Sequence, residues 1–499
     1  MTSILDFVPA GFTPRSVQID VLQSVERSWN THKVFVIQAP VSSGKSLIAI
    51  TIANWAQSLS KSTAILTPQV MLQDQYVETF PDIPSLKGRA RYSCHDEDAE
   101  TCEDRHAIDD KYCAECPYVA CKSQAAASPS AIYNLYSYMA TRDNKQVLIV
   151  DEAHNIFSQL QEFYTLKIYQ DEENYPNNLN TQGDAVAWLE SHVPKLQGMV
   201  AKMYQSSKIK LTPELTKHIS TLRRKITKFQ GLIEGIQRSP GHFFYEEKIE
   251  KVRGRERRFL LIRPVTLTHT VNRLWDSHHK IVLMSGSINR IDLTDAGLNP
   301  QYSKFINCAS PIPPENRPVL FQPVASMSSK HLPKALPLVA QRLNELLLQY
   351  PGKGIVHVTY DMVPKLKKLL DDPRFLFHTK TNKQTIYKKF RSSSEPLVLV
   401  AAGMSEGIDL VGEDYEWQVI AKVIFPSLGD KLIQHLKELD PEWYSWQTIK
   451  TVVQQSGRIC RTPTDKGTTI ILDANFRFLY YRSKNLFPSY FTDALNMKA

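Results

Sequence analysis

Short runs of β-branched and aliphatic residues recur along the chain, and segments long enough for helices separate them. The first set of runs is Val34–Ala39, Thr63–Thr67, Val147–Val150 and Ile281–Met284. The second set is Gly354–Thr359, Leu397–Ala401, Val419–Phe425 and Thr468–Asp473. Strands that alternate with helices favour parallel sheets built from βαβ units. The pattern predicts the α/β fold class with two parallel-sheet domains, joined by a linker at the proline-rich stretch 311–323.

The chain has 499 residues, and typical domain sizes suggest roughly three to four folded units. Two segments interrupt the first α/β domain. One is polar and rich in cysteine, and the other carries apolar residues at spacings of three and four, which indicates packed helices. We predict a first domain in three parts (1–87, 123–157 and 265–312), a cysteine-rich insertion at 88–122, a helical arch-like insertion at 158–264, and a second domain at 313–499.

The segment Ala39–Ser46 (APVSSGKS) resembles a phosphate-binding loop, because it follows an apolar strand and precedes a helix-like run. In such a loop, backbone N–H groups and the helix amino terminus face the phosphates. Lys45 is predicted to contact the β- and γ-phosphates, and Ser46 to bind Mg²⁺. Serine stands at position 42, where glycine is common, so Ser42 must adopt whatever backbone angle the loop demands.

Two acids follow directly after the predicted strand Val147–Val150, in the sequence Asp-Glu-Ala-His at 151–154. The carboxyl end of a strand is where α/β sheets bind ligands. Asp151 is predicted to hold Mg²⁺, and Glu152 to polarise the water that attacks the γ-phosphate. His154 is expected to couple this site to the second domain.

Five of the seven cysteines are concentrated in one short segment: Cys94, Cys102, Cys113, Cys116 and Cys121. In a reducing compartment, such a cluster of thiols favours a metal site over disulfides. Four thiolates suit an iron–sulfur cluster, and they suit tetrahedral zinc equally well. The spacing alone favours zinc and leaves the iron–sulfur cluster as the alternative.

Lys and Arg exceed Asp and Glu by 60 to 51, which gives a net charge of +9 and suits a polyanionic partner such as nucleic acid. No apolar run reaches the length of a membrane span, and the amino terminus lacks the pattern of a secretory signal. We therefore expect a cytoplasmic or nucleoid-associated protein with no membrane partner.

Further motifs appear in order along the chain. They are Thr13–Asp20 (TPRSVQID), Thr67–Gln75 (TPQVMLQDQ), Ile281–Ser287 (IVLMSGS), Met404–Leu410 (MSEGIDL) and Gln454–Arg461 (QQSGRICR). With the loop at 39–46 and the Asp-Glu-Ala-His segment, this series resembles the XPD/DinG group of superfamily 2 helicases with a DEAH box. The resemblance covers nearly the whole chain.

The resemblance implies two RecA-like domains with ATP and Mg²⁺ between them. Lys45, Asp151, Glu152, Arg458 and Arg461 are the implied catalytic residues, with Arg461 as arginine finger. Ser46 and Asp151 are the implied Mg²⁺ ligands, and Thr67 is expected to contact the nucleic-acid backbone. The implied nucleotide-binding residues are Arg15, Gln18, Ala39, Pro40, Val41, Ser42, Ser43, Gly44, Lys45, Ser46, Asp151, Glu406, Asp409 and Arg461. Ser285 and Ser287 are expected to relay the nucleotide state, and Gly407 to allow close approach.

The resemblance also implies that the cysteine segment binds a [4Fe–4S] cluster. The implied ligands are Cys94, Cys102, Cys113 and Cys116, and the second choice replaces Cys102 by Cys121. The expected activity is ATP-dependent DNA unwinding by a monomer that moves 5′ to 3′ on single-stranded DNA and opens forked or tailed duplexes. The rivals are a nucleic-acid-stimulated ATPase that does not unwind, and a helicase that tracks RNA. No nuclease activity is expected.

Overall fold

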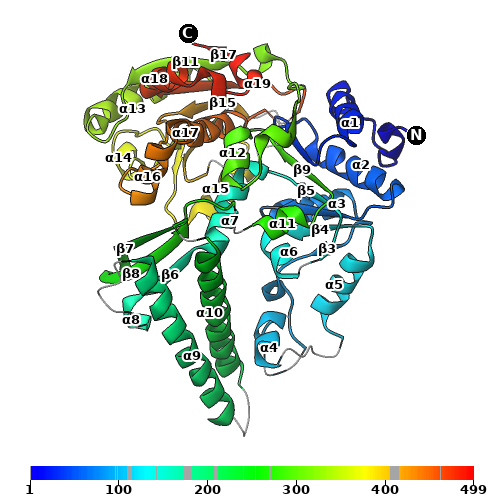
Figure 1. Ribbon diagram of the computed structural model, residues 1–499. Coiled ribbons are helices and arrows are strands. Elements are labelled where there is room, and N and C mark those ends of the chain that lie inside the picture. Colours follow the sequence, from blue (N-terminus) through cyan, green and yellow to red (C-terminus); the bar gives the residue numbers. More distant parts are fainter. Residues whose placement is uncertain are drawn as a thin grey trace.

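The computed structural model describes residues 2–95, 97, 99–109, 115–141, 143–173, 175, 181–206, 212–239, 241–252, 254–268, 271–404, 415–460 and 462–498. Two parallel seven-stranded sheets form the body of the molecule, and an elongated insertion extends from it (Figure 1). The predicted α/β fold class is confirmed. None of the helices in the described ranges is long and apolar enough to cross a membrane.

The first sheet has the strand order β10-β1-β9-β5-β2-β4-β3, and its neighbouring strands pair in parallel. Its strands are β1 (Val34–Gln38), β2 (Thr63–Thr67), β3 (Ser85–Leu86), β4 (Ser130–Asn134), β5 (Val147–Val150), β9 (Lys280–Ser285) and β10 (Ser303–Asn307). The helices of this part are α1 (Ser16–Ser28), α2 (Lys45–Ser58), α3 (Val70–Thr79), α4 (Cys102–Asp109), α5 (Pro117–Ala127), α6 (Leu135–Thr141), α7 (Ile156–Tyr164), α11 (Asn272–Asp276) and α12 (Arg290–Asp295).

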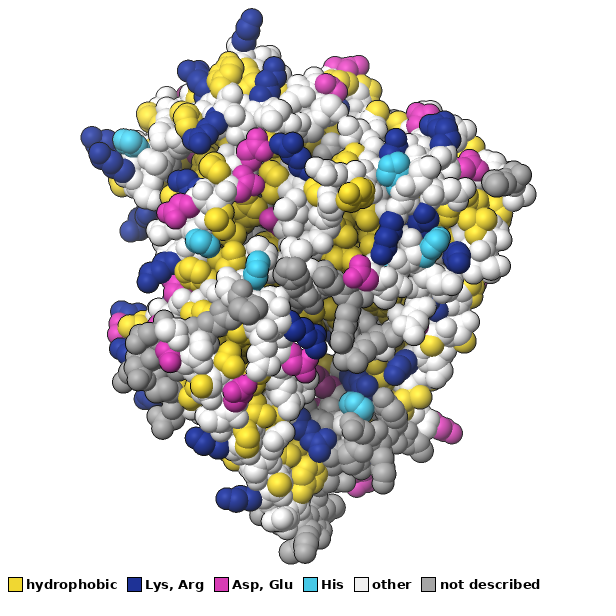
Figure 2. Space-filling model, viewed as in Figure 1, with side chains coloured by type: hydrophobic (Ala, Val, Ile, Leu, Met, Phe, Trp, Pro, Cys, Tyr) yellow, Lys and Arg dark blue, Asp and Glu magenta, His cyan; other side chains and the backbone are white. Residues whose placement is uncertain are grey.

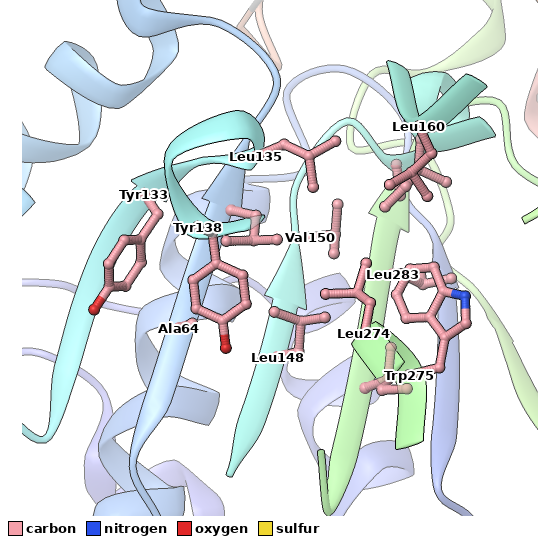
Figure 3. Close-up of a cluster of buried hydrophobic side chains, with 14 of the residues drawn as sticks. Ala64, Tyr133, Leu135, Tyr138, Leu148, Val150, Leu160, Leu274, Trp275 and Leu283 are labelled. Atoms are coloured by element: carbon pink, nitrogen blue, oxygen red, sulfur yellow. The ribbon is translucent and has the colours of Figure 1, made fainter. Parts of the chain in front are cut away.

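Alternate residues of these strands point to opposite faces, and both faces are buried, as parallel sheets require. Leu148 and Val150 pack with Leu135, Tyr138 and Trp275 on one face (Figure 3). On the other face, Val147 and Ile149 pack with residues of α1, α2 and α3. Continuous apolar strands of this kind fix the loops at their carboxyl ends, where the candidate site lies.

The second sheet has the order β13-β14-β12-β15-β16-β11-β17. Its strands are β11 (Val319–Ala325), β12 (Lys353–Val358), β13 (Phe375–Phe377), β14 (Val398–Ala402), β15 (Tyr415–Ile420), β16 (Thr468–Asp473) and β17 (Leu495–Asn496). Its helices are α13 (Leu332–Gln349), α14 (Val363–Leu366), α15 (Lys383–Ser392), α16 (Lys431–Leu439), α17 (Pro441–Ser456), α18 (Asn475–Arg482) and α19 (Ser489–Thr492). Below, domain 1 and domain 2 denote the parts built on the first and second sheets.

Two strands of the second sheet differ from the sequence prediction. β15 covers 415–420, whereas the prediction placed this strand at 419–425. The difference arises at Gln418, because a polar residue is not expected in a buried strand. Its side chain is nevertheless buried, and its amide donates hydrogen bonds to the Ser456 carbonyl (2.7 Å) and the Thr469 hydroxyl (2.8 Å). The predicted linker also contains β11, so the crossover between the sheets lies between residues 307 and 319.

The insertion combines two long helices with a small antiparallel sheet. Its elements are β6 (Leu166–Tyr169), α8 (Gln170–Glu173), α9 (Gln182–Ser206), α10 (Pro213–Arg238), β7 (Phe243–Val252) and β8 (Arg255–Pro264). The helices were expected. The β6-β8-β7 sheet was not, because charged residues interrupt the alternation of apolar residues in β7 and β8. Figure 1 shows α9 and α10 side by side, pointing away from domain 2.

Candidate functional site

The loop between β1 and α2 has the backbone of a phosphate-binding loop. Ser42 and Gly44 both have positive φ, 69° and 75° respectively, so Ser42 adopts the strained angle that glycine would adopt at little cost. The Ser43 hydroxyl donates to the Pro40 carbonyl (2.7 Å), and the Ala39 amide donates to the Ser285 carbonyl (2.8 Å). The amino terminus of α2 thereby faces the space in front of the sheet, where an anion binds well.

Two side chains from the segment that precedes β1 hold this loop in place through hydrogen bonds. The Arg15 guanidinium donates to the Ser42 carbonyl, and the Gln18 amide donates to the Gly44 carbonyl (3.3 Å). A Cβ atom at position 44 would lie 2.1 Å from Nε2 of Gln18, so close approach adds a second reason for glycine there. The structure therefore brings Arg15 and Gln18 to the loop, and their binding of the nucleotide stays a prediction.

The two acids after β5 lie next to the loop. Nζ of Lys45 is 3.1 Å from Oε1 of Glu152, and Glu152 itself has a positive φ of 49°. Asp151 is 2% exposed and accepts a hydrogen bond from the Tyr76 hydroxyl (2.9 Å). The Ser46 hydroxyl is hydrogen-bonded to the same tyrosine. Tyr76 therefore gathers the two predicted Mg²⁺ ligands, Ser46 and Asp151, around one point.

Burial, and then the charge of Glu152, raise the pKa of Asp151 to about 6, although Lys45 opposes the shift. Burial acts in the same direction on Glu152, but Lys45 and His154 outweigh it and hold the pKa of Glu152 below its usual range. Burial and the charge of Asp151 raise the pKa of Tyr76 well above its ordinary value, so its hydroxyl keeps its proton as a donor. The site thus holds one ionised carboxylate and one that gains its proton readily.

His154 links Glu152 to the end of β9. Its Nδ1 lies 2.8 Å from the Ser285 hydroxyl and 3.3 Å from Oε2 of Glu152. On the domain 2 side, α17 reaches the same segment: the Gln454 amide donates to the Ser287 hydroxyl (2.7 Å), and Nζ of Lys450 donates to the His154 carbonyl (3.3 Å). The structure therefore places His154, Ser285 and Ser287 where they can transmit a change between the domains.

A pocket of about 50 Å³ lies between the two domains at this point. Lys45, Glu152 and the backbone of the phosphate loop line it from domain 1, and the end of α17 lines it from domain 2. Two further lining residues, Arg317 and Tyr490, were not predicted, because neither belongs to a motif. The Arg317 guanidinium donates to the carbonyls of Ile312 (2.8 Å) and Tyr490, and the Tyr490 hydroxyl donates to the Gly286 carbonyl (2.9 Å).

The remaining residues of the predicted site either lie away from the pocket or fall outside the described residues. Arg458 is 8% exposed and lies beside the Gln454 side chain (3.5 Å), and it is not among the residues that line the pocket. Glu406, Gly407, Asp409 and Arg461 lie outside the described residues.

Thr67 does not match its predicted role. Its side chain is buried (1% exposed), and its hydroxyl donates to the Gln69 carbonyl (3.3 Å) inside domain 1. A strand that follows the surface of the domain cannot reach a hydroxyl in this position, so the prediction that Thr67 contacts the nucleic-acid backbone is wrong.

The cysteine segment packs against the core of domain 1. Cys102 and Cys116 are buried with their Sγ atoms 3.7 Å apart, and Cys94 packs at the edge of the same core. Cys121 packs at the edge of the same core and lies near Tyr92. Cys113 lies outside the described residues. Within the described ranges, no group of three or more His, Cys, Asp or Glu side chains is arranged to bind a metal ion.

A hollow of about 1500 Å³ lies among α9, α10, α6, α7 and the cysteine segment, while α10 itself contacts α4 of that segment. Basic, aromatic and acidic side chains line it, among them Arg89, Arg223, Lys228, Tyr136, Phe163, Glu103 and Glu162. Figure 2 shows Lys and Arg side chains around the hollow on one face of the molecule. Two ion pairs cross from α10 to the cysteine segment: Lys217 to Glu100 (3.5 Å) and Arg224 to Glu103 (3.2 Å).

Solved structures share this arrangement over nearly the whole chain. One titled as an XPD helicase superposes with a TM-score of 0.63 at 15% identity, covering 97% of this chain and 100% of the other. Xpd4 of S. tokodaii gives 0.60 at 14% identity, with the same coverage of 97% and 100%. A third, titled as apo XPD, gives 0.56 at 15% identity over 93% and 97% of the chains. The chain has the fold of the XPD helicases.

Two family models agree with this XPD-type fold. Residues 344–493 match the helicase C-terminal domain, and residues 11–179 match the type III restriction enzyme, res subunit. The first match lies in domain 2, and the second covers the amino-terminal part of domain 1 and the start of the insertion. The comparison with curated proteins found no match.

Proposed function

We propose that the chain is an ATP-dependent DNA helicase that moves along single-stranded DNA and opens duplexes. One observation carries the proposal: Lys45, Glu152, Ser46 and Asp151 meet at the junction of the two RecA-like domains, and α17 of domain 2 contacts the same segment. An ATPase site at a domain junction can convert hydrolysis into domain motion. The domain limits deduced from the sequence belong to the same proposal.

The residues of the site have distinct roles in this proposal. The Lys45 ammonium and the loop amides bind the β- and γ-phosphates of ATP, and the oxygens of Ser46 and Asp151 hold Mg²⁺, which neutralises developing charge on the phosphates. When Lys45 turns to the phosphates it leaves Glu152, whose carboxylate then accepts a hydrogen bond from the attacking water. His154, the second group that lowers the pKa of Glu152, remains beside the carboxylate in that state.

The pocket of about 50 Å³ is smaller than a nucleotide, so ATP enters only when the side chains of the two domains move apart. Arg461 and Arg458 are proposed to approach the γ-phosphate from domain 2 as the domains close again. Guanidinium groups in that position stabilise transition-state charge and make hydrolysis depend on closure. Glu406 and Asp409 are proposed to lie at the same junction.

The hollow between the insertion and domain 1 is the proposed path of the strand. Arg89, Arg223 and Lys228 offer charge to the phosphates, and Tyr136 and Phe163 offer rings on which bases stack. Such contacts are independent of sequence and weaken with salt. DNA as the track and movement from 5′ to 3′ rest on the resemblance to the XPD/DinG group.

For the cysteine segment we propose a [4Fe–4S] cluster held by Cys94, Cys102, Cys113 and Cys116. The closeness of Cys102 to Cys116 supports this ligand set over its alternative, which lacks Cys102. The cluster supplies folding free energy to a polar segment with few apolar residues. Zinc is the second candidate, because two thiolates bound to one tetrahedral ion at about 2.3 Å lie roughly 3.8 Å apart.

A strand-separation assay on forked DNA tests the proposed function. The protein should open a fork with a 5′ single-stranded tail in the presence of ATP, and should leave a fork with only a 3′ tail closed. Rapid hydrolysis stimulated by single strands, with no separation on either fork, would indicate an ATPase that remodels nucleic-acid complexes instead. Stimulation by RNA but not by DNA would reassign the track.

A further inference from the structure

The ion pairs that the insertion makes with domain 2 centre on one carboxylate, that of Asp430. This residue immediately precedes α16, which faces β7 and β8 of the insertion (Figure 1). The Arg263 guanidinium of β8 donates to both Asp430 oxygens, at 2.7 and 2.9 Å, and Nζ of Lys248 on β7 donates at 3.1 Å. A bidentate Arg–carboxylate contact fixes orientation as well as distance.

The contact is partly shielded from water and balanced in charge. Glu246 is almost completely buried and pairs with the same two cations, with Lys248 at 2.9 Å and Arg263 at 3.2 Å. The cluster therefore contains two acids and two cations, and one of the acids comes from domain 2. Arg263 and Lys248 hold the pKa of Asp430 below its usual range, although burial acts in the opposite direction.

Apolar contacts accompany these ion pairs. The Phe244 ring of β7 stacks near the His435 ring of α16, with their centroids 6.2 Å apart. Val265, directly after β8, is buried in the core of domain 2 together with Leu432 and Trp446. The end of the insertion therefore packs against domain 2, although both of its chain connections lead to domain 1.

Asp430 is also the N-cap of α16, because its carboxylate accepts hydrogen bonds from the Leu432 amide (2.9 Å) and the Ile433 amide (3.4 Å). The helix it caps packs on α17 through Leu432 and Leu436. Since α17 carries Gln454 to the pocket between the domains, a continuous series of packed elements connects the insertion to the proposed ATP site.

We propose that Asp430 is a positioning residue that makes the insertion move with domain 2. Closure of the domains on ATP then shifts α10 relative to the cysteine segment and changes the hollow through which the strand passes. On the other side, α10 packs along α4 of the cysteine segment, and among the described residues the ion pairs Lys217–Glu100 and Arg224–Glu103 cross this contact. Surface ion pairs of this kind are weak. The inference rests on the proposed function for its consequence, but the contact itself can be tested separately.

The test variant is Asp430→Asn, because asparagine caps a helix as well as aspartate does and removes only the charge. The matched control is Arg257→Gln on the same strand β8. Arg257 makes a bidentate contact with Asp171 (2.7 and 2.8 Å), and this pair lies wholly inside the insertion. Amide hydrogen exchange of β7 and α16 reports the contact, and the base pairs opened per ATP hydrolysed report its consequence.

In Asp430→Asn we expect exchange at β7 and α16 to rise roughly tenfold, which corresponds to about 1.4 kcal/mol, and the base pairs opened per ATP to fall several-fold. Arg257→Gln should change neither quantity. Arg263→Gln should reproduce the loss, and the double variant should be no worse than either single one. Unchanged exchange at both elements would overturn the contact, and unchanged coupling despite faster exchange would overturn its role. A wild-type protein that opens no duplex would refute the helicase function while leaving the exchange result to decide the contact.

Discussion

Lys45 and Glu152 form an ion pair in the structure, and both are proposed to act on the γ-phosphate. Lys45→Ala should lower ATP hydrolysis at least about a hundredfold, because the phosphate charge loses its cation. Binding of single-stranded DNA should remain, since the hollow lies elsewhere. Steady-state hydrolysis and fluorescence anisotropy with a labelled oligonucleotide measure the two effects.

The matched control is Lys33→Ala, an exposed lysine just before β1. It should hydrolyse ATP at the wild-type rate. Hydrolysis within twofold of wild type in Lys45→Ala would show that the loop at 39–46 does not bind the phosphates.

The raised pKa of Asp151 predicts an acidic limit to hydrolysis. A carboxyl group with a raised pKa takes up its proton at a higher pH than usual, so the ionised form that binds Mg²⁺ is lost as the pH falls through about 6. The concentration of Mg²⁺ needed for half-maximal hydrolysis should therefore rise steeply below pH 6. Tyr76→Phe should move this limit to higher pH, because the Tyr76 hydrogen bond favours the ionised carboxylate.

Tyr175→Phe is the control, because the Tyr175 hydroxyl also donates to a carboxylate, that of Glu247 (3.2 Å), but within the insertion. It should leave the limit in place. A limit that stays unchanged in Tyr76→Phe would mean that another group controls the acidic loss.

Site residues could be predicted from the sequence only where they belong to a recognisable motif. Lys45, Ser46, Asp151 and Glu152 stand in recognisable patterns after strands, and the structure brings them together. Tyr76 and Arg317 also face the site, but a tyrosine in a helix and an arginine in a linker have no distinguishing neighbours. Their positions follow from tertiary packing. Thr67 shows the opposite case, because it belongs to a motif, but the motif does not reveal that its side chain is buried.

At the scale of elements, the cysteine segment makes the sharpest prediction. Cys116→Ser should remove the bound metal and the unwinding of forks, because Cys116 lies beside Cys102 in the core of domain 1. Cys121→Ser is the matched control on the same helix and should keep both. Iron, sulfide and zinc contents of protein prepared without oxygen measure the first effect.

Hydrolysis of ATP should persist in Cys116→Ser, since Lys45 and Glu152 belong to another part of the chain. Loss of metal from Cys121→Ser with retention in Cys116→Ser would require the other ligand set. Stoichiometric zinc without iron in the wild-type protein would replace the cluster by a zinc site.

Elements were predictable from the sequence where apolar runs are continuous. β1, β2, β5 and β9 are buried on both faces, and their composition shows it. The hairpin β7–β8 was missed because one face is exposed and carries lysine, arginine and glutamate, so its pattern resembles that of a polar helix. The predicted bounds of β15 were wrong because the polar Gln418 is buried and its side-chain amide is hydrogen-bonded inside domain 2. No local sequence pattern reveals such partners.

At the scale of the whole molecule, two seven-stranded sheets enclose the nucleotide site, and the insertion and cysteine segment enclose a hollow on the side of domain 1. The order of strands and helices indicated the two sheets. How the insertion contacts domain 2 could not be deduced, since Asp430 and Arg263 are far apart in the sequence and belong to no motif. Long-range ion pairs of this kind appear only in the folded structure.

The most direct measurement of the central claim is the ATP-dependent opening of two forks that differ only in the polarity of their single-stranded tail. Wild-type protein should open the fork with the 5′ tail, and Glu152→Gln should bind ATP and DNA but open neither fork, because the attacking water loses its acceptor. Salt should slow the reaction, since backbone contacts dominate. Opening of the 3′-tailed fork alone would contradict the assigned polarity, and opening by Glu152→Gln at the wild-type rate would contradict the proposed ATP-driven mechanism.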